Sequence, residues 1–177
     1  MNLTSKIREG EQIAPWRAVK EVKFRIGDSG ISGKGLFATD EIKAGEQLFM
    51  ITGKMMEHKY SPEFAKEGPD WIGYTACKWL APDSENPILY LNHSCNPNCF
   101  INEELGVIAM KPIAPGEELF LDYSTTEIDP YWELDCNCKQ NNCRKKIKAF
   151  QNLPKTLQFR YLKYIPMRLF KFIPTKG

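Results

Sequence analysis

The sequence predicts a mainly β fold that forms a single domain. Short apolar runs are repeatedly broken by Gly, Pro and Asn, the pattern of strands joined by tight turns. No internal repeat or low-complexity tract occurs. With 177 residues and 42% hydrophobic content, the chain is long enough to bury a core and is not mainly disordered.

The strand candidates follow one another along the chain. They cover residues 22–26, 33–38, 47–52, 71–80, 99–102, 107–111 and 118–122. The pair at 99–102 and 107–111 reads as a hairpin that turns near residues 104–106. One short helix is expected early, over residues 61–66, with Ser61 as its cap and a proline in its first turn.

Helical spacing becomes clear only in the tail, residues 150–177. Apolar side chains recur there at positions Leu153, Leu157, Tyr161 and Tyr164. Pro154 is tolerated in a first turn, and Pro166 ends the pattern. We therefore expect one basic amphipathic helix that docks on the body; binding to a membrane surface or a partner is the alternative.

Charge is nearly balanced overall, with 24 Lys and Arg against 22 Asp and Glu, but it is unevenly placed. Residues 151–177 carry six basic side chains and no acidic one, which leaves 18 basic against 22 acidic, a charge of −4, for residues 1–150. An acidic body suits a basic protein substrate, and a basic tail suits nucleic acid or an anionic surface. An ordinary solvated charged face is the commoner explanation of either observation.

The sequence contains no apolar stretch long enough to span a membrane, and its first residues lack the apolar segment of a secretory signal. We therefore expect an intracellular protein, cytoplasmic, or nuclear or on host chromatin where the source or an export route allows. In such a compartment thiols stay reduced.

Six cysteines occur, and the last three fall within eight residues: Cys77, Cys95, Cys99, Cys136, Cys138 and Cys143. Such density suits thiolates that converge on a zinc ion. Three thiolates need a fourth ligand, and because the chain holds only two histidines, we look for it among the first three cysteines. Unpaired structural cysteines are the alternative reading.

Residues 92–99, Asn-His-Ser-Cys-Asn-Pro-Asn-Cys, place seven polar or thiol side chains around one proline directly after an apolar run. A segment of this kind is hard to bury without a purpose. Taken alone, it reads equally well as an Asn-rich turn that satisfies its own backbone, with His93 as a hydrogen-bonded core histidine.

Four segments occur in an order typical of one enzyme family: residues 33–38, 92–99, 116–123 and 136–143. In this order the sequence resembles SET-domain protein lysine methyltransferases with a post-SET zinc motif, and in length it looks like the compact stand-alone, bacterial-type members. The resemblance implies a SET domain over residues 20–125, a post-SET zinc-binding segment over 132–148, and the C-terminal basic amphipathic helix or tail over 150–177.

The resemblance also implies a fold and a reaction. The fold would consist of several small curved sheets with short helices, a C-terminal helix and a threaded, pseudoknot-like active site. In that site the octet strand passes under a loop closed by residues 122–123, an exception to the usual topology rules. The reaction would be methyl transfer from S-adenosylmethionine to a lysine amine of a histone or other basic protein.

Site residues are implied where the motifs match. The cofactor set is Gly33, Lys34, Gly35, Leu36, Phe37, Asn92, His93 and Tyr123. The structural zinc set is Cys95, Cys136, Cys138 and Cys143, with Cys99 as the alternative fourth ligand. Tyr123 is the expected catalytic residue, and Cys77 is expected to be a small buried hydrophobic side chain.

Two substrate-channel positions depart from the family pattern. Ile51 stands where many members carry a second tyrosine, and Leu121 stands at an aromatic position that tunes how many methyl groups fit. Both replacements make the pocket roomier, so we expect di- or trimethylation. The lost tyrosine also leaves an alternative, a catalytically weak SET-fold binding module that acts through its basic tail.

Overall fold

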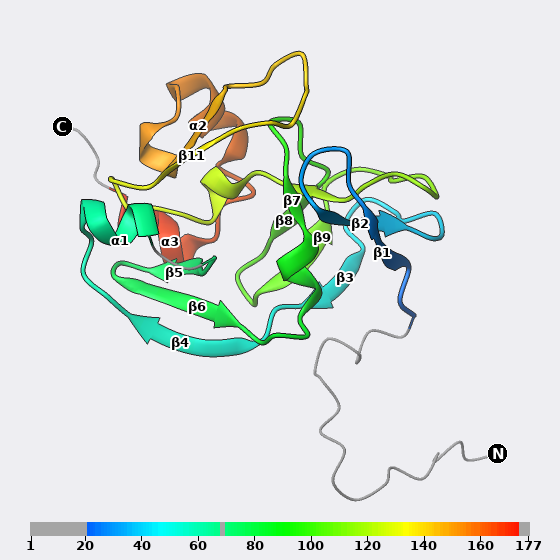
Figure 1. The fold of residues 1–177 in the computed structure, drawn as a ribbon, viewed down its shortest axis with the longest axis horizontal. Helices are drawn as coiled ribbons and strands as arrows, with labels where there is room; N and C mark the ends of the chain where they lie inside the picture. The colour runs from blue at the N-terminus through cyan, green and yellow to red at the C-terminus, as the bar shows by residue number, and fades with distance from the viewer. Residues whose placement is uncertain (1–20, 68–69, 174–177) are drawn as a thin grey trace, which may run out of the picture.

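The computed structural model describes residues 21–67 and 70–173, and within them the fold is mainly β, as predicted. The strands form four small sheets, of two, five, two and three strands (Figure 1). The helices are short and lie around these sheets. No helix in the described ranges is both long and apolar enough to cross a bilayer.

The first sheet is an antiparallel pair, β1 (Phe24–Asp28) with β2 (Lys34–Ala38). The prediction of two strands here is confirmed, with the first strand beginning two residues later than expected. Gly33 adopts a φ of +48° in the connecting turn, a conformation that favours glycine. Ser29 N donates to Gly33 O at 2.9 Å and closes the loop.

The central sheet has five strands in the order β3-β9-β8-β10-β7. Their bounds are β3 Gln47–Met50, β7 Asn92–His93, β8 Cys99–Ile101, β9 Gly106–Ala109 and β10 Phe120–Leu121. The predicted hairpin is confirmed as β8 and β9, which pair antiparallel. Its turn contains Leu105 at a φ of +67°.

Strand β10 gives this sheet its unusual topology, because it lies between β7 and β8 and runs parallel to both. Phe120 is in register with Asn92, and Leu121 with both His93 and Cys99. The segment joining β7 to β8 therefore passes around β10. This arrangement agrees with the threaded fold that the sequence implied.

The third sheet is an antiparallel sheet of β4 (Gly53–Glu57), β6 (Lys78–Pro82) and β5 (Ile72–Thr75). The single extended segment expected over residues 71–80 is in fact a hairpin, and β4 was not predicted. Cys77 lies in the hairpin turn at a φ of +56° and is only half-buried, so its expected role as a buried hydrophobic side chain is wrong.

Helix α1 (Pro62–Glu67) begins as predicted, with the Ser61 Oγ accepting from Phe64 N at 3.1 Å. Three 3₁₀ turns follow: η2 (Pro87–Tyr90), η3 (Tyr123–Thr125) and η4 (Phe150–Asn152). A last antiparallel pair, β11 (Glu133–Asp135) with β12 (Lys146–Lys148), flanks the cysteine-rich loop.

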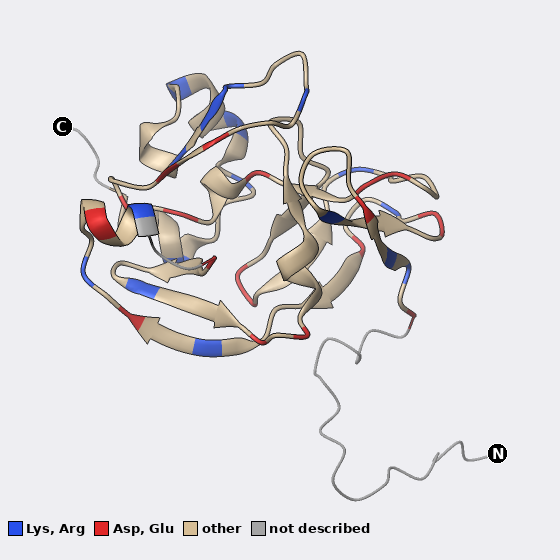
Figure 2. Cartoon of the chain, in the orientation of Figure 1, with Lys and Arg blue, Asp and Glu red and all other residues tan. Residues whose placement is uncertain are grey.

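The tail holds two short helices, α2 (Lys155–Tyr161) and α3 (Met167–Phe170), instead of the one predicted. Pro166 ends the first helical pattern but also caps the start of α3. The tail does dock on the body, through a second apolar cluster that joins it to Ile128: Phe150, Leu153, Tyr161, Ile165 and Leu169. Along α2 the ribbon carries basic residues and no acidic ones (Figure 2).

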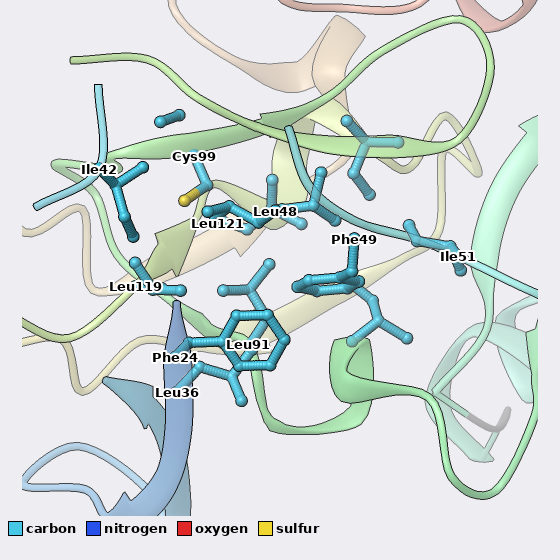
Figure 3. Packing of buried hydrophobic residues seen from close by; sticks show 14 of the residues in the cluster. Phe24, Leu36, Ile42, Leu48, Phe49, Ile51, Leu91, Cys99, Leu119 and Leu121 are labelled. Carbon is cyan, nitrogen blue, oxygen red and sulfur yellow. The ribbon is translucent and has the colours of Figure 1, made fainter. Parts of the chain in front are cut away.

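The main core fills the space between the first sheet and the central sheet. Figure 3 shows its side chains pointing into one interior from β1, β2, β3 and β10. The Phe24 and Phe49 rings meet at 5.3 Å between centroids, tilted by 57°. Because Leu121 and Cys99 belong to this core, the threaded strand is held by packing as well as by hydrogen bonds.

Docking of the tail predicts a clear contrast between two substitutions. Leu169 is 0% exposed, so Leu169→Ala should lower the free energy of unfolding by about 2 to 5 kcal/mol through lost burial and a cavity. Phe159 is 78% exposed, and Phe159→Ala should change it by about 0.5 kcal/mol or less. Urea denaturation measures both; equal effects would contradict a docked tail.

Candidate functional site

A cavity of about 350 Å³ lies where the central sheet meets the third sheet and the segment before β11. Residues far apart in the chain line it, among them Trp71, Leu91, Asn92, Leu121, Tyr123 and Trp132. Its walls combine apolar and aromatic side chains with polar and charged ones, including Lys66, Asp70 and Glu127. Such a mixture suits a bound organic ligand whose orientation is fixed by a small number of polar contacts.

The parallel pairing of β7 and β10 brings Asn92 and His93 close to Tyr123. Tyr123 is the second residue after the end of β10. The backbone N–H of Tyr123 donates to His93 Nδ1 at 3.2 Å, and the two rings lie 5.3 Å apart. The Tyr123 hydroxyl donates to the Leu91 carbonyl at 2.9 Å. Tyr123 is thus held at its backbone by His93 and at its hydroxyl by Leu91, the residue just before the octet.

His93 is neutral at neutral pH. Burial lowers its pKa to about 4, against the opposing effect of the Asp122 carboxylate 3.6 Å away. Since Nδ1 accepts the Tyr123 N–H, the ring proton belongs on Nε2, which lies 3.5 Å from Cys95 Sγ. The neutral imidazole therefore lies between Tyr123 and Cys95. Its Nδ1 accepts from the Tyr123 backbone, and its Nε2–H faces the Cys95 sulfur.

Tyr123 is a neutral phenol for the same physical reason. Burial raises its pKa to about 12, so the hydroxyl keeps its proton. The hydroxyl donates a hydrogen bond to Leu91 O. The oxygen lone pairs remain as acceptors on the cavity side. A neutral acceptor of this kind can orient an amine without trapping it as a tight ion pair.

Asn92 fastens the glycine-rich turn to the cavity. Its Nδ2 lies 2.9 Å from Lys34 O and 3.3 Å from Ser32 O, and 3.0 Å from Glu118 Oε1. A Cβ added at Gly35 would collide with the Glu118 carboxyl group, so a larger residue there would displace the Glu118 side chain that Asn92 contacts. The backbone of this turn is thereby presented beside the cavity.

A buried ion pair lies beneath the site. Arg144 Nη1 and Nη2 each donate to a different oxygen of Asp122 at 2.7 Å, and Asp122 is 1% exposed. The Asp122 carboxylate raises the pKa of Arg144 above its usual value despite partial burial. The backbone N–H of Arg144 also donates to Cys95 Sγ at 3.4 Å, so one residue links the cavity to the cysteines.

The structure brings together four cysteines whose sulfur atoms all lie within 4.8 Å of one another: Cys95, Cys136, Cys138 and Cys143. Two of the separations to Cys136 Sγ are 3.7 Å, from Cys95, and 3.6 Å, from Cys143. Tetrahedral zinc with Zn–S bonds of about 2.3 Å places sulfurs about 3.8 Å apart. The cluster therefore fits a structural zinc ion with four thiolates.

Cys99, the alternative fourth ligand, lies elsewhere. It is 1% exposed within the main core, and burial raises the pKa of its thiol to about 12. Its sulfur is 3.5 Å from the side-chain oxygen of Asn98. A protonated thiol in an apolar core does not serve as a zinc ligand, so the geometry favours Cys95.

The other predicted site residues divide into two groups. Asn92, Tyr123 and Leu121 line the cavity, whereas Ile51 packs in the main core and is not among the lining residues. The glycine-rich segment, residues 33–37, is not among the lining residues, and the Leu36 side chain is fully buried in the core. Only Ser32, which directly precedes this segment, lines the cavity. His93 lies directly behind Tyr123.

Sequence reasoning missed part of the cavity wall and its support. Trp71, Glu127 and Trp132 line the cavity but lie outside the recognised motifs. Arg144 was also overlooked, although its place directly after Cys143 was a usable signal, because a cation beside thiolate ligands has an obvious electrostatic role.

Comparison with known proteins gives one family. The family model described as "SET domain" matches residues 33–124, just over half of the chain. Among curated relatives, Histone-lysine N-methyltransferase MEDEA of Arabidopsis thaliana is 34% identical over 140 residues, which are 71% of this chain and 20% of that protein. The chain spans 40% or less of the length of the curated relatives that it matches.

Two solved structures share the fold. The methyltransferase domain of human Histone-lysine N-methyltransferase SETMAR aligns with a TM-score of 0.58 at 20% identity, over 73% of this chain and 59% of that one. KRYPTONITE, solved in complex with mCHH DNA, an H3(1-15) peptide and SAH, aligns with a TM-score of 0.54 at 22% identity, over 72% of this chain and 30% of that one.

The cysteine geometry predicts which thiols hold metal. Cys95→Ser should lower the zinc content of the purified protein well below a single ion per chain, because three thiolates bind zinc far less tightly than four. The matched change Cys99→Ser, on the same octet, should leave the zinc content unchanged. Inductively coupled plasma mass spectrometry of the folded proteins measures the zinc content of both variants. Zinc lost from Cys99→Ser and kept by Cys95→Ser would reverse the assignment.

Proposed function

Because the chain belongs to the SET-domain family, we propose that it is an S-adenosylmethionine-dependent protein lysine methyltransferase. One observation carries this proposal: the parallel β7–β10 pairing brings Asn92 and Tyr123 to one cavity, which Ser32 of the turn before β2 also lines. Asn92 holds this turn in place through Lys34 O. The chemistry available there is placement of two reactants beside an oriented phenol. No acid, base or nucleophile of high reactivity is needed for methyl transfer to a neutral amine.

The cofactor's part is to supply an electrophilic methyl group on a sulfonium centre. The residues proposed to hold it are the turn ending in β2, through its backbone, together with Asn92. Their fit rests on geometry: three hydrogen-bond acceptors converge on the Asn92 amide and fix the turn against β7. The glycines leave the main chain of that turn accessible to a ligand.

The chain must also favour the neutral form of the substrate amine. With a reference pKa near 10.4, a lysine amine is neutral at pH 7 only at a cost of about 4 to 5 kcal/mol. Apolar walls such as Leu121 and Leu91 reduce this cost by desolvating the charged form. Tyr123, neutral and fixed by Leu91 O, then accepts an N–H of the amine and holds it in line.

The proposed substrate is a lysine in a histone or another basic protein. The acidic balance of residues 1–150 supports a basic partner, and MEDEA and KRYPTONITE are proteins whose names or complexes refer to histones. An intracellular location is proposed with it, because four clustered cysteines stay reduced and free to bind zinc in such a compartment. Contact of the basic tail with nucleic acid would appear as salt-dependent binding lost on deletion of residues 151–177.

The function is tested with Tyr123→Phe, which removes the oriented hydroxyl and keeps the ring. Labelled methyl transfer to mixed histones should fall about 100-fold in kcat, the usual effect of losing one group that stabilises the transition state. Affinity for S-adenosylmethionine, measured by calorimetry, should stay the same. Tyr131→Phe, at a half-exposed tyrosine near the cysteine loop, is the matched control and should retain full activity.

Two outcomes would redirect the proposal. Cofactor binding without any transfer by the unaltered protein would favour the alternative, a binding module that uses the fold as a scaffold. Absence of cofactor binding would refute the function altogether. Full activity of Tyr123→Phe would refute only the role of its hydroxyl.

The size of the Leu121 side chain should determine how many methyl groups the substrate amine can receive. It lines the cavity as an aliphatic side chain, so room remains for an amine that already carries methyl groups. We expect di- and trimethylated products at saturating cofactor, and mainly monomethylated product from Leu121→Tyr, because the larger ring narrows the cavity. Mass spectrometry of the product peptide distinguishes them; strictly one methyl group from the unaltered enzyme would contradict the expectation.

A further inference from the structure

A second, smaller hollow lies beside the active-site cavity and is not explained by the reaction. Its volume is about 20 Å³, and three tryptophans, Phe64 and two carboxylates line it: Trp71, Trp79, Trp132, Glu127 and Asp129. It shares Ala65, Trp71, Glu127 and Trp132 with the larger cavity, so the two hollows are adjacent. We refer to the smaller hollow as the aromatic recess.

The aromatic recess contains an unsatisfied charge acceptor. Asp129 is 1% exposed, and its Oδ1 accepts from Tyr131 N at 2.9 Å. Its Oδ2 is buried and has no hydrogen-bond partner among the residues that the structure describes. A buried carboxylate oxygen without a donor is costly, so its surroundings suit a ligand that donates to it.

Both oxygens of the second carboxylate, Glu127, already accept hydrogen bonds, so Asp129 Oδ2 is the carboxylate oxygen of the recess that has no donor among the described residues. Glu127 Oε2 accepts from Trp79 Nε1 at 2.8 Å, and its Oε1 accepts from the backbone N–H groups of Ile128 and Asp129 at 2.6 and 2.7 Å. These bonds fix the Trp79 ring as one wall. Burial raises the pKa of both carboxyl groups, a penalty that a bound cation would relieve.

The walls of the recess also favour a cation. Phe64 packs against Trp79 with centroids 5.0 Å apart and against Trp71 at 5.9 Å. No residue lining the recess is basic, and neither Glu127 nor Asp129 forms a salt bridge within the described part of the chain. Aromatic faces and a lone carboxylate oxygen together attract positive charge.

Size decides which cation fits. A hollow of about 20 Å³ has room for a group about as large as one water molecule. A primary ammonium group has that size, whereas a guanidinium or trimethylammonium group is larger. The recess adjoins the larger cavity at the residues that the two share, so the alkyl chain that carries the ammonium group can approach from that side.

We propose that the aromatic recess binds the ammonium group of a second, unmethylated lysine of the protein substrate, near the lysine that is methylated. The ammonium donates to Asp129 Oδ2 and lies against the tryptophan rings. This subsite rests on the proposed function for its biological role. Its affinity for a primary amine does not depend on turnover, so the two can be tested separately.

The binding test uses n-butylammonium chloride and the indole N–H signals of ¹⁵N-labelled protein. The Trp79 signal, whose proton is bonded to Glu127, and the Trp132 signal should shift in a saturable manner. Tetramethylammonium and guanidinium at equal ionic strength should leave both signals in place. Absence of a saturable shift, or equal shifts with tetramethylammonium, would overturn the proposal.

Asp129→Asn removes the charge at nearly constant shape and should weaken butylammonium binding about tenfold, the usual effect of losing a hydrogen bond to a charged group. Asp40→Asn, an exposed carboxylate that lines neither hollow, is the matched control and should bind normally. Unchanged binding by Asp129→Asn would overturn the proposal. Should that variant not fold, Trp132→Leu tests the aromatic wall instead, and undiminished binding would be equally decisive.

The substrate role is tested with peptides in which each lysine around the methylated one is replaced by trimethyllysine. At one position this change should raise KM and leave kcat unchanged, and Asp129→Asn should abolish the difference. Turnover without any sensitive position would overturn the substrate role. Amine binding without turnover would refute the proposed function and still support the ammonium site.

Discussion

The threading of β10 between β7 and β8 is the constraint on which the rest of the structure depends. Strands of two residues, such as β7 and β10, are too short to hold together by a backbone ladder alone. The Asn98 side chain extends the ladder, because its Nδ2 donates to Glu118 O at 2.8 Å and its Oδ1 accepts from Phe120 N at 2.7 Å. The Asn-rich octet therefore has a structural role, which accounts for the burial of its polar residues His93, Ser94 and Asn98.

One ion pair, between Asp122 and Arg144, connects the threaded strand to the cluster of four cysteines. Asp122 follows β10, accepts both donors of Arg144, and lies beneath His93. Arg144 in turn touches Cys95 through its backbone. Removing the arginine would leave a buried carboxylate without a cationic partner, although Asp122 Oδ1 would still accept from Ser124 N. The loss would destabilise both the region around Tyr123 and the cysteine cluster. The segment that leads into the cysteine cluster also lines the cavity, through Trp132 and Leu134.

The sequence predicted those features of the fold that depend on interactions between residues close together in the chain. The glycine turn before β2, the β8–β9 hairpin and the Ser61 cap each depend on a few neighbouring residues, and each was predicted from the sequence. Strand β4 was missed because its exposed Lys-Met-Met-Glu pattern lacks apolar alternation and is specified by pairing with β6. The tail was predicted as one helix because spacing alone does not show that Pro166 can start a second helix as well as end a first.

The part of the cavity that no motif marks is held by a close backbone contact. The third sheet contributes Trp71 next to β5, and β5 is tied to the segment after Tyr123 by the Gly73 N–H, which donates to Thr126 O at 2.8 Å. A Cβ at Gly73 would collide with that carbonyl oxygen, so a side chain there would push the aromatic wall away from the cavity. The motif residues set the chemistry, and this wall sets what can lie beside it. Changes in substrate preference should therefore arise in residues 53–82, without disturbing the threaded strand.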